Sequence, residues 1–161
     1  MFKRTKLRFK YGCLLAGMTA LSALPALAET AVFGTLTLSP GFKPSEGVVS
    51  GYTSGSTSLP AIVANQDRQG NKCLGFADNA PDYKMVLQKD FPQLAIQVDS
   101  GGKDTTLAIK GPDGTIRCAD DTGKNKDASI QDPDWKAGNY EVWVGSIEAG
   151  SRWNYKLTVR Q

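Results

Sequence analysis

The stretch Gly102–Gln161 reads, in order, Asp104-Thr-Thr-Leu-Ala-Ile-Lys110, Gly111-Pro-Asp-Gly114, Thr115-Ile-Arg-Cys-Ala-Asp-Asp121, Ala137-Gly-Asn-Tyr-Glu-Val-Trp-Val-Gly145 and Tyr155-Lys-Leu-Thr-Val159. Apolar and polar residues alternate within most of these pieces, and turn residues separate them. Such alternation gives a strand one buried face and one solvated face. Pro112 sets its own φ for a turn and Gly114 closes it, so the segments from Thr105 and Thr115 are expected to form a hairpin.

The same pattern extends toward the N-terminus. Strands are predicted at 33–38, 46–53, 83–88, 93–99, 105–110, 140–146 and 153–159. Ala61–Ala64 fits either a short strand or a helical turn. Asp132-Pro133-Asp134 is expected to form an extended turn, and Trp135 is expected to lie in a loop. Short strands separated by turns, with no apolar stripe at helical spacing, predict an all-β fold, an antiparallel β-sandwich.

The N-terminus has the features of an export signal that forms a helix and is then cleaved. Basic residues up to Lys10 precede a short apolar run, Cys13–Leu24, and then Pro25 and Ala26-Leu27-Ala28. The run is shorter than the roughly 20 residues of a membrane span, and Ala-x-Ala is typical of a cleavage site. Cleavage is predicted after Ala28; the alternative is an uncleaved amphipathic anchor.

Residues 1–28 are thus read as a signal peptide and 29–161 as a single β-sandwich domain. Within that domain, 33–72 is a less regular N-terminal part and 73–161 is the regular core. The protein is expected to be exported to the periplasm or beyond the cell, with no membrane span after cleavage.

Charge and composition exclude several classes of function. The chain has 19 Lys+Arg and 16 Asp+Glu; removing the five basic residues of the signal leaves 14, and a formal net charge of −2. Nucleic-acid binding is therefore not expected. The chain has no histidine, which removes the Ser-His-Asp and Cys-His constellations and most catalytic zinc sites. We expect that the protein is not an enzyme.

Cys73 and Cys118 are the cysteines that remain after signal cleavage. In a small exported domain an even pair of cysteines indicates a disulfide. The alternatives are two buried free thiols, or a pair of metal ligands that lacks its other members.

An acidic loop supplies the candidate metal ligands, which are Asp104, Asp120, Asp121, Asn125 and Asp127. Ca²⁺ takes about six to eight oxygen ligands, so carboxylates and loop carbonyls suit it. Lys124 and Lys126 lie in the same segment and oppose a cation. The alternative is that these residues are turn formers and solvated charges. No cofactor other than Ca²⁺ is indicated.

Trp143 is a candidate ligand-binding residue. It is out of phase with Tyr140, Val142 and Val144, so it is expected on the opposite face of its strand. An exposed tryptophan there could stack on a sugar or anchor a partner protein. Alternatively an N-terminal segment covers that face, or Trp143 packs beside the disulfide.

The order of these motifs resembles the bacterial pre-peptidase C-terminal domain, from about Tyr83 to Gln161. The matching elements are Asp104-Thr-Thr-Leu-Ala-Ile109, Gly111-Pro-Asp-Gly114, Asp120-Asp121, Ala137-Gly-Asn-Tyr-Glu-Val-Trp-Val144 and Tyr155-Lys-Leu-Thr-Val159. Cys73-Leu-Gly-Phe76 also looks like the extended forms in which a cysteine there pairs with one just before the acidic pair.

The resemblance implies a jelly-roll-like sandwich without a catalytic role, linked to secretion, adhesion and, in some branches, calcium. We therefore expect a secreted, non-catalytic binding or accessory module of the cell envelope, which calcium could stabilise and whose partner is a glycan or an envelope protein. The alternative is a structural or chaperone-like component of an envelope protein complex. The resemblance usually involves a module beside a peptidase domain; without one in this sequence, we expect any partner to act in trans.

Overall fold

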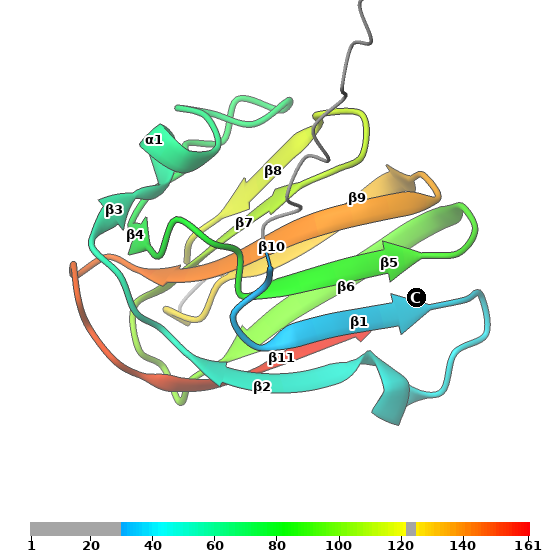
Figure 1. Ribbon diagram of the computed structural model, residues 1–161, viewed down its shortest axis with the longest axis horizontal. Helices are drawn as coiled ribbons and strands as arrows, with labels where there is room; N and C mark the ends of the chain where they lie inside the picture. The colour runs from blue at the N-terminus through cyan, green and yellow to red at the C-terminus, as the bar shows by residue number, and fades with distance from the viewer. Residues whose placement is uncertain (1–29, 122–124) are drawn as a thin grey trace, which may run out of the picture.

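A computed structural model describes residues 30–121 and 125–161. These residues form two β-sheets packed face to face, with little helix (Figure 1). The predicted all-β sandwich is therefore confirmed. The predicted signal peptide at 1–28 lies outside the described residues.

The larger sheet has seven strands arranged around a long central strand, β10. Its strands are β1 (Gly34–Leu38), β3 (Thr57–Ser58), β4 (Phe76–Ala77), β5 (Tyr83–Leu87), β7 (Thr105–Lys110), β8 (Ile116–Ala119) and β10 (Gly138–Ser146). Strand β10 pairs antiparallel with β4, β5 and β7, and β8 extends the sheet beyond β7. The predicted hairpin across Gly111–Gly114 is thus β7–β8, and β8 is an edge strand.

The smaller sheet has four strands in the order β2-β11-β6-β9. They are β2 (Val48–Tyr52), β6 (Phe91–Asp99), β9 (Ser129–Trp135) and β11 (Asn154–Arg160), all paired antiparallel. A short 3₁₀-helix, η1 (Pro44–Gly47), leads into β2, and a single turn of α-helix, α1 (Leu59–Ile62), follows β3.

Inward-facing side chains of both sheets form the main core. In β11 the alternation places Tyr155, Leu157 and Val159 inward, with exposed fractions of 4%, 1% and 0%. Burying an aliphatic side chain of this size contributes about 1.5–3 kcal/mol, so the strand pattern accounts for the packing of the two sheets.

A second hydrophobic cluster lies on the other face of the larger sheet. Its buried members are Leu59, Cys73, Ala77, Ala108, Cys118 and Trp143. Cys73 and Cys118 form a disulfide, as expected from the cysteine count, and it ties the segment after α1 to β8. This cluster explains why five of the six residues of β7 are buried, since both faces of that strand are covered.

Two features differ from the sequence-based expectation. Strand β9 contains Asp132-Pro133-Asp134, which was expected to form an extended turn, and Trp135, which was expected in a loop. As an edge strand, β9 tolerates proline. In addition, β1 pairs parallel with β5. The long connection through β2, β3 and β4 permits this pairing, which a tight hairpin would not.

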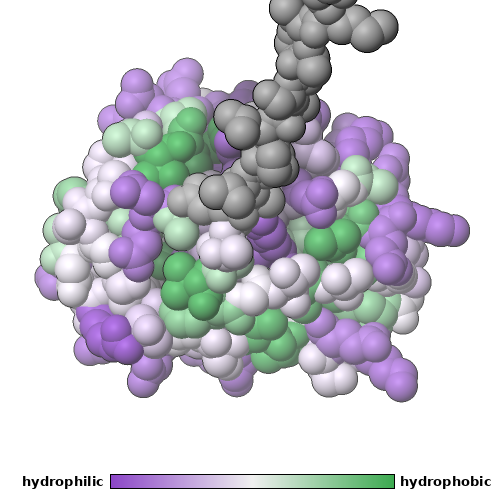
Figure 2. Space-filling model, viewed as in Figure 1, coloured by the Kyte–Doolittle hydropathy of each residue, from purple (hydrophilic) through white to green (hydrophobic). Residues whose placement is uncertain are grey.

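The surface carries only small hydrophobic areas on the face shown in Figure 2, each bordered by hydrophilic residues. The large hydrophobic side chains that are exposed in the described part of the chain are Val32, Val48, Leu74 and Ile147. Within residues 30–121 and 125–161, no helix has the length and hydrophobicity required to cross a bilayer.

Candidate functional site

A polar cleft of about 410 Å³ lies where the edge strand β8 of the larger sheet faces the edge strand β9 of the smaller sheet. The loop that carries Asp67 to Leu74 forms its third wall. The disulfide between Cys73 and Cys118 links that loop covalently to β8. The cleft is the candidate site because it combines a concave surface with several charged groups.

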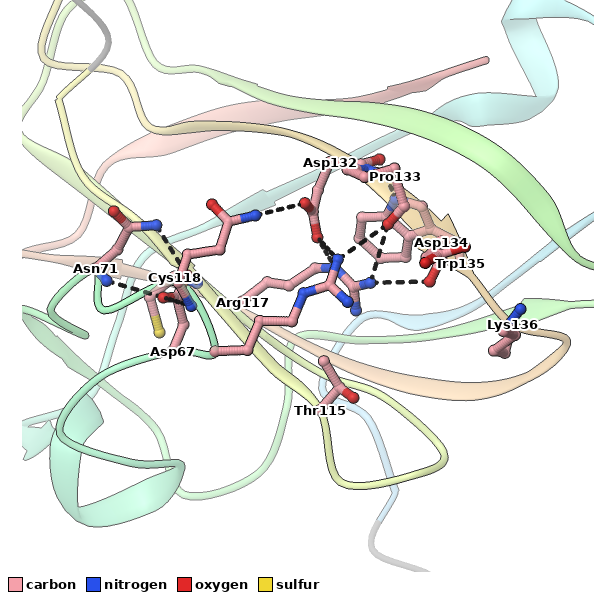
Figure 3. A network of polar contacts seen from close by, with 12 residues as sticks. Asp67, Asn71, Thr115, Arg117, Cys118, Asp132, Pro133, Asp134, Trp135 and Lys136 are labelled. Carbon is pink, nitrogen blue, oxygen red and sulfur yellow. Dashed lines mark hydrogen bonds and ion pairs between the residues drawn. The ribbon is translucent and has the colours of Figure 1, made fainter.

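Asp132, on β9, is the centre of the network within the cleft (Figure 3). Its Oδ2 accepts hydrogen bonds from Nε of Arg117 at 2.5 Å and from Nη2 of Arg68 at 2.6 Å. Its Oδ1 accepts one from Nε2 of Gln69 at 2.7 Å. Both carboxylate oxygens are therefore engaged, and the Asp132 side chain is only 4% exposed.

Arg117 is held equally firmly. Its Nη2 donates to the carbonyl oxygens of Pro133 and Asp134, at 3.4 and 3.1 Å. The guanidinium carbon lies 4.1 Å from the ring centroid of Trp135, a cation–π contact visible in Figure 3. Nε and Nη2 of Arg117 are therefore engaged within the protein, and the side chain joins β8 to β9.

Asp67 organises the loop on the third wall. Its carboxylate accepts hydrogen bonds from the backbone amides of Gln69, Asn71 and Cys118 and from the side-chain amide of Asn71. Burial alone would raise the pKa of Asp67, but these hydrogen bonds outweigh burial and lower it. Asp67 therefore stays ionised and acts as a structural acceptor.

The acidic end of the cleft is a group of three carboxylates. Asp104, Asp120 and Asp121 each place an oxygen within 4.8 Å of the others. The pairing of Leu107 with Ala119 explains this, because it sets the end of β8 beside the start of β7. Asp120 and Asp121 also line the cleft.

Asp120 is the member of this group with an unpaired buried oxygen and a raised pKa. Its Oδ1 is buried and has no hydrogen-bond partner among residues 30–121 and 125–161. Partial burial raises the pKa of Asp120, and the charges of Asp121 and Asp104 raise it further. Burial and like-charge repulsion both disfavour the ionised form of Asp120, and the charge of Lys126 opposes them.

Lys126 offsets part of this negative charge. Its Nζ lies 2.6 Å from Oδ2 of Asp104, and this hydrogen bond is the largest cause of the raised pKa of Lys126. The lysine is exposed, so solvent screens the pair and its stabilising effect is small. Lys124, also expected in this region, lies outside the described residues.

Asp127 is not a member of this group of three carboxylates. The Asp127 carboxylate accepts hydrogen bonds from the amides of Ser100 and Gly102, at 2.9 and 3.1 Å, and from the Ser100 hydroxyl. The Asn125 side-chain oxygen accepts a hydrogen bond from the amide of Asp127 at 3.2 Å. Asp127 therefore closes the turn after β6, a role that its position in sequence did not reveal.

Trp143 is not an exposed platform. It is 3% exposed and packs in the second hydrophobic cluster with the disulfide, while its Nε1 donates to the carbonyl of Asn79 at 3.3 Å. An exposed, ligand-stacking Trp143 does not agree with this burial, whereas the alternative stated above, that Trp143 packs beside the disulfide, does. The phase argument placed the side chain on the correct face, but the disulfide and α1 cover that face.

Sequence patterns alone did not single out Arg68, Gln69 and Arg117. Arg117 carried a usable signal, since a charged residue between Ile116 and Cys118 of a buried strand requires a partner. The partner could not be named because Asp132 lies on a strand that the sequence did not predict.

No protein-family model matches this sequence, and no curated protein matches it. Among solved structures, the chain is similar to the pre-peptidase C-terminal domain of a collagenase from Bacillus anthracis, with 13% sequence identity and a TM-score of 0.46. The similarity covers 78% of this chain and 94% of that chain. That domain is of the type that the sequence motifs resemble, although identity and TM-score are too low to transfer a function.

Proposed function

We propose that this chain is an exported, non-catalytic binding module of the cell envelope, whose β8–β9 cleft takes a glycan or a protein partner. We further propose that Ca²⁺ stabilises the acidic end of this cleft. The observation that carries the proposal is the convergence of Asp104, Asp120 and Asp121 within 4.8 Å at the edge of the cleft.

The three carboxylates fit a hard cation. Ca²⁺ prefers oxygen ligands, and these residues supply them from two adjacent strand ends. The buried Asp120 Oδ1 without a partner is the kind of atom that a cation would satisfy. Bound Ca²⁺ would supply the positive charge that relieves repulsion among the carboxylates. Lys126 would then compete with the cation for Asp104.

Two of the carboxylates that line the cleft, Asp132 and Asp67, favour binding over catalysis, and turnover measurements on Asp120→Asn test a third, Asp120. A general acid or base needs a group that is free to exchange a proton with a ligand. The oxygens of Asp132 are occupied by Arg117, Arg68 and Gln69, and Asp67 is held ionised by its own loop. The chain also contains no histidine.

Export is supported by the disulfide between Cys73 and Cys118. Disulfides persist in oxidising compartments and are rare in the cytosol. This agrees with the signal-peptide pattern in the sequence, while the choice between periplasm and extracellular space is left to experiment.

The alternative, a structural or chaperone-like component, relied on docking through an exposed Trp143. With Trp143 buried, that role lacks the surface first assigned to it.

The proposal is tested by immobilising the mature protein and exposing it to envelope extract and to a glycan panel, with Ca²⁺ and with a chelator. We expect Ca²⁺-dependent capture of one glycan or one stoichiometric protein. Asp121→Asn should weaken this capture, and Asp134→Asn, an exposed control away from the three carboxylates, should not. Absence of capture in both conditions, or substrate turnover lost in Asp120→Asn, would contradict a non-catalytic binding role.

A further inference from the structure

Asp82 is a buried carboxyl that does not belong to the lining of the β8–β9 cleft. Asp82 directly precedes β5 in the sequence, and the residue is only 6% exposed. Its Oδ2 accepts a hydrogen bond from the amide of Val144 on β10, at 2.6 Å. Its backbone oxygen accepts one from the amide of Phe33, at 2.9 Å, so the same residue also holds the segment that enters β1.

The titratable groups that face Asp82 are Asp78, Tyr83 and Tyr155, and none of them is cationic. Asp78 is itself engaged by the Ser54 hydroxyl. A buried carboxyl without a cationic partner favours its neutral form, since transfer of an isolated charge from water is very unfavourable.

Tyr83 and Tyr155 extend this group across the sandwich. Their hydroxyls lie close to each other and to Asp82, and both are buried without a hydrogen-bond partner among residues 30–121 and 125–161. Burial raises the pKa of Tyr83 to about 12, so both tyrosines stay protonated at ordinary pH.

The two hydroxyls pack closely against Gly51 on β2. A Cβ built at Gly51 would lie 2.7 Å from the Tyr155 hydroxyl and 2.8 Å from the Tyr83 hydroxyl, too close for a side chain to fit. Both hydroxyls therefore lie near the same point between the sheets. A shallow depression lined by Phe33, Gly51 and Tyr155 lies at this place on the surface.

The group thus connects the two sheets, since Tyr83 belongs to β5 of the larger sheet and Tyr155 to β11 of the smaller sheet. Burial is the largest cause that raises the pKa of Asp82, to about 7, and the charge of Asp78 acts in the same direction. The Val144 amide and the Tyr155 hydroxyl oppose the rise.

From this arrangement we infer that the buried Asp82 carboxyl, beside Tyr83 and Tyr155 and without a cation, makes the stability of the packing between the two sheets pH-dependent, with the folded domain most stable while Asp82 is protonated and less stable once it ionises. In the unfolded chain the carboxyl ionises near pH 3.8, whereas in the folded domain it ionises near pH 7. Stability from this group is therefore full below about pH 3.8 and is lost as the pH rises to about 7.

The experiment is to measure chemical unfolding of the purified protein from pH 5 to pH 8, together with a carbon-13 titration of the Asp82 carboxyl. Because the chain has no histidine, few other side chains titrate in this window. We expect the unfolding equilibrium constant to rise by up to about tenfold per pH unit below the midpoint, and to level off above it. Asp82→Asn should lose this rise, and Asp99→Asn, an exposed control, should keep it.

Tyr155→Phe provides a second variant, should Asp82→Asn not fold. Removing the hydroxyl that stabilises the carboxylate should move the Asp82 titration to higher pH. Amide exchange at Phe33 and Val144, corrected for intrinsic rates, should become faster above pH 7 in the wild type. Equal pH dependence in wild type and Asp82→Asn, or an Asp82 titration that is complete below pH 5, would overturn the inference.

Discussion

Nε of Arg117 lies 2.5 Å from Oδ2 of Asp132, and this contact joins the edge strand of one sheet to the edge strand of the other. Both side chains are 4% exposed. Arg68 and Gln69 of the neighbouring loop donate hydrogen bonds to the same carboxylate, so the loop and both edge strands meet at Asp132. The geometry of the proposed binding site therefore depends on a buried ion pair.

Removing one partner of this pair should destabilise the domain strongly. Arg117→Met leaves the buried Asp132 carboxylate with Arg68 and Gln69 as donors, so the loss should approach but not exceed the about 3–5 kcal/mol that a buried charge without any partner costs. Urea unfolding of wild type and variant measures the loss. Lys136→Met, which removes the exposed pair with Asp90, is the control and should have no measurable effect. Equal losses in the two variants would show that the buried pair has no special role.

The disulfide between Cys73 and Cys118 should contribute stability through the chain that it closes. The two cysteines are 45 positions apart, and closing a loop of this length contributes about 4 kcal/mol in the chain-entropy treatment. Comparing unfolding of the oxidised protein with that of Cys73→Ala/Cys118→Ala measures the effect. Two reactive thiols in the denatured, unreduced protein would contradict the bridge itself.

Trp143→Ala should act on stability and leave ligand binding unchanged. The side chain is buried beside the disulfide, and truncating a buried tryptophan costs about 3–5 kcal/mol. Calorimetric melting should show a lower Tm, while the folded fraction should still bind the cleft ligand. A folded variant of normal stability that no longer binds would restore Trp143 as a contact residue.

Local sequence patterns predicted the parts of this structure that depend on local alternation and turns. The β7–β8 hairpin follows from Gly111–Gly114, and the inward face of β11 follows from its period of two. The approach of Asp104 to the Asp120-Asp121 pair was also accessible, because a hairpin brings its two outer ends together.

Long-range relationships could not be predicted in the same way. The sequence 129–135 contains residues that disfavour strands, and only the edge position of β9 beside β6 makes a strand possible. Because β9 was not predicted as a strand, the sequence could not indicate that its residue Asp132 pairs with Arg117. Trp143 shows the same limit, since alternation gives the face of a side chain but not what covers it.

Calcium binding should weaken as the pH falls. Burial and the neighbouring acids raise the pKa of Asp120 above its usual value, so protons compete with the cation at a higher pH than for an ordinary aspartate. Calorimetric titrations at pH 7.5 and pH 5 should give the lower affinity at pH 5. Lys126→Met should bind Ca²⁺ more tightly than wild type, because it frees Asp104 from its ion pair.

The most direct measurement is calorimetric titration of Ca²⁺ into the wild-type protein, with a thermal-shift assay on the same samples. We expect binding heat and a raised Tm at millimolar Ca²⁺, a range found for extracellular modules. Both signals should be lost in Asp120→Asn and retained in Asp134→Asn. If the wild type shows neither heat nor a thermal shift at millimolar Ca²⁺, the carboxylates at Asp104, Asp120 and Asp121 are not a calcium site.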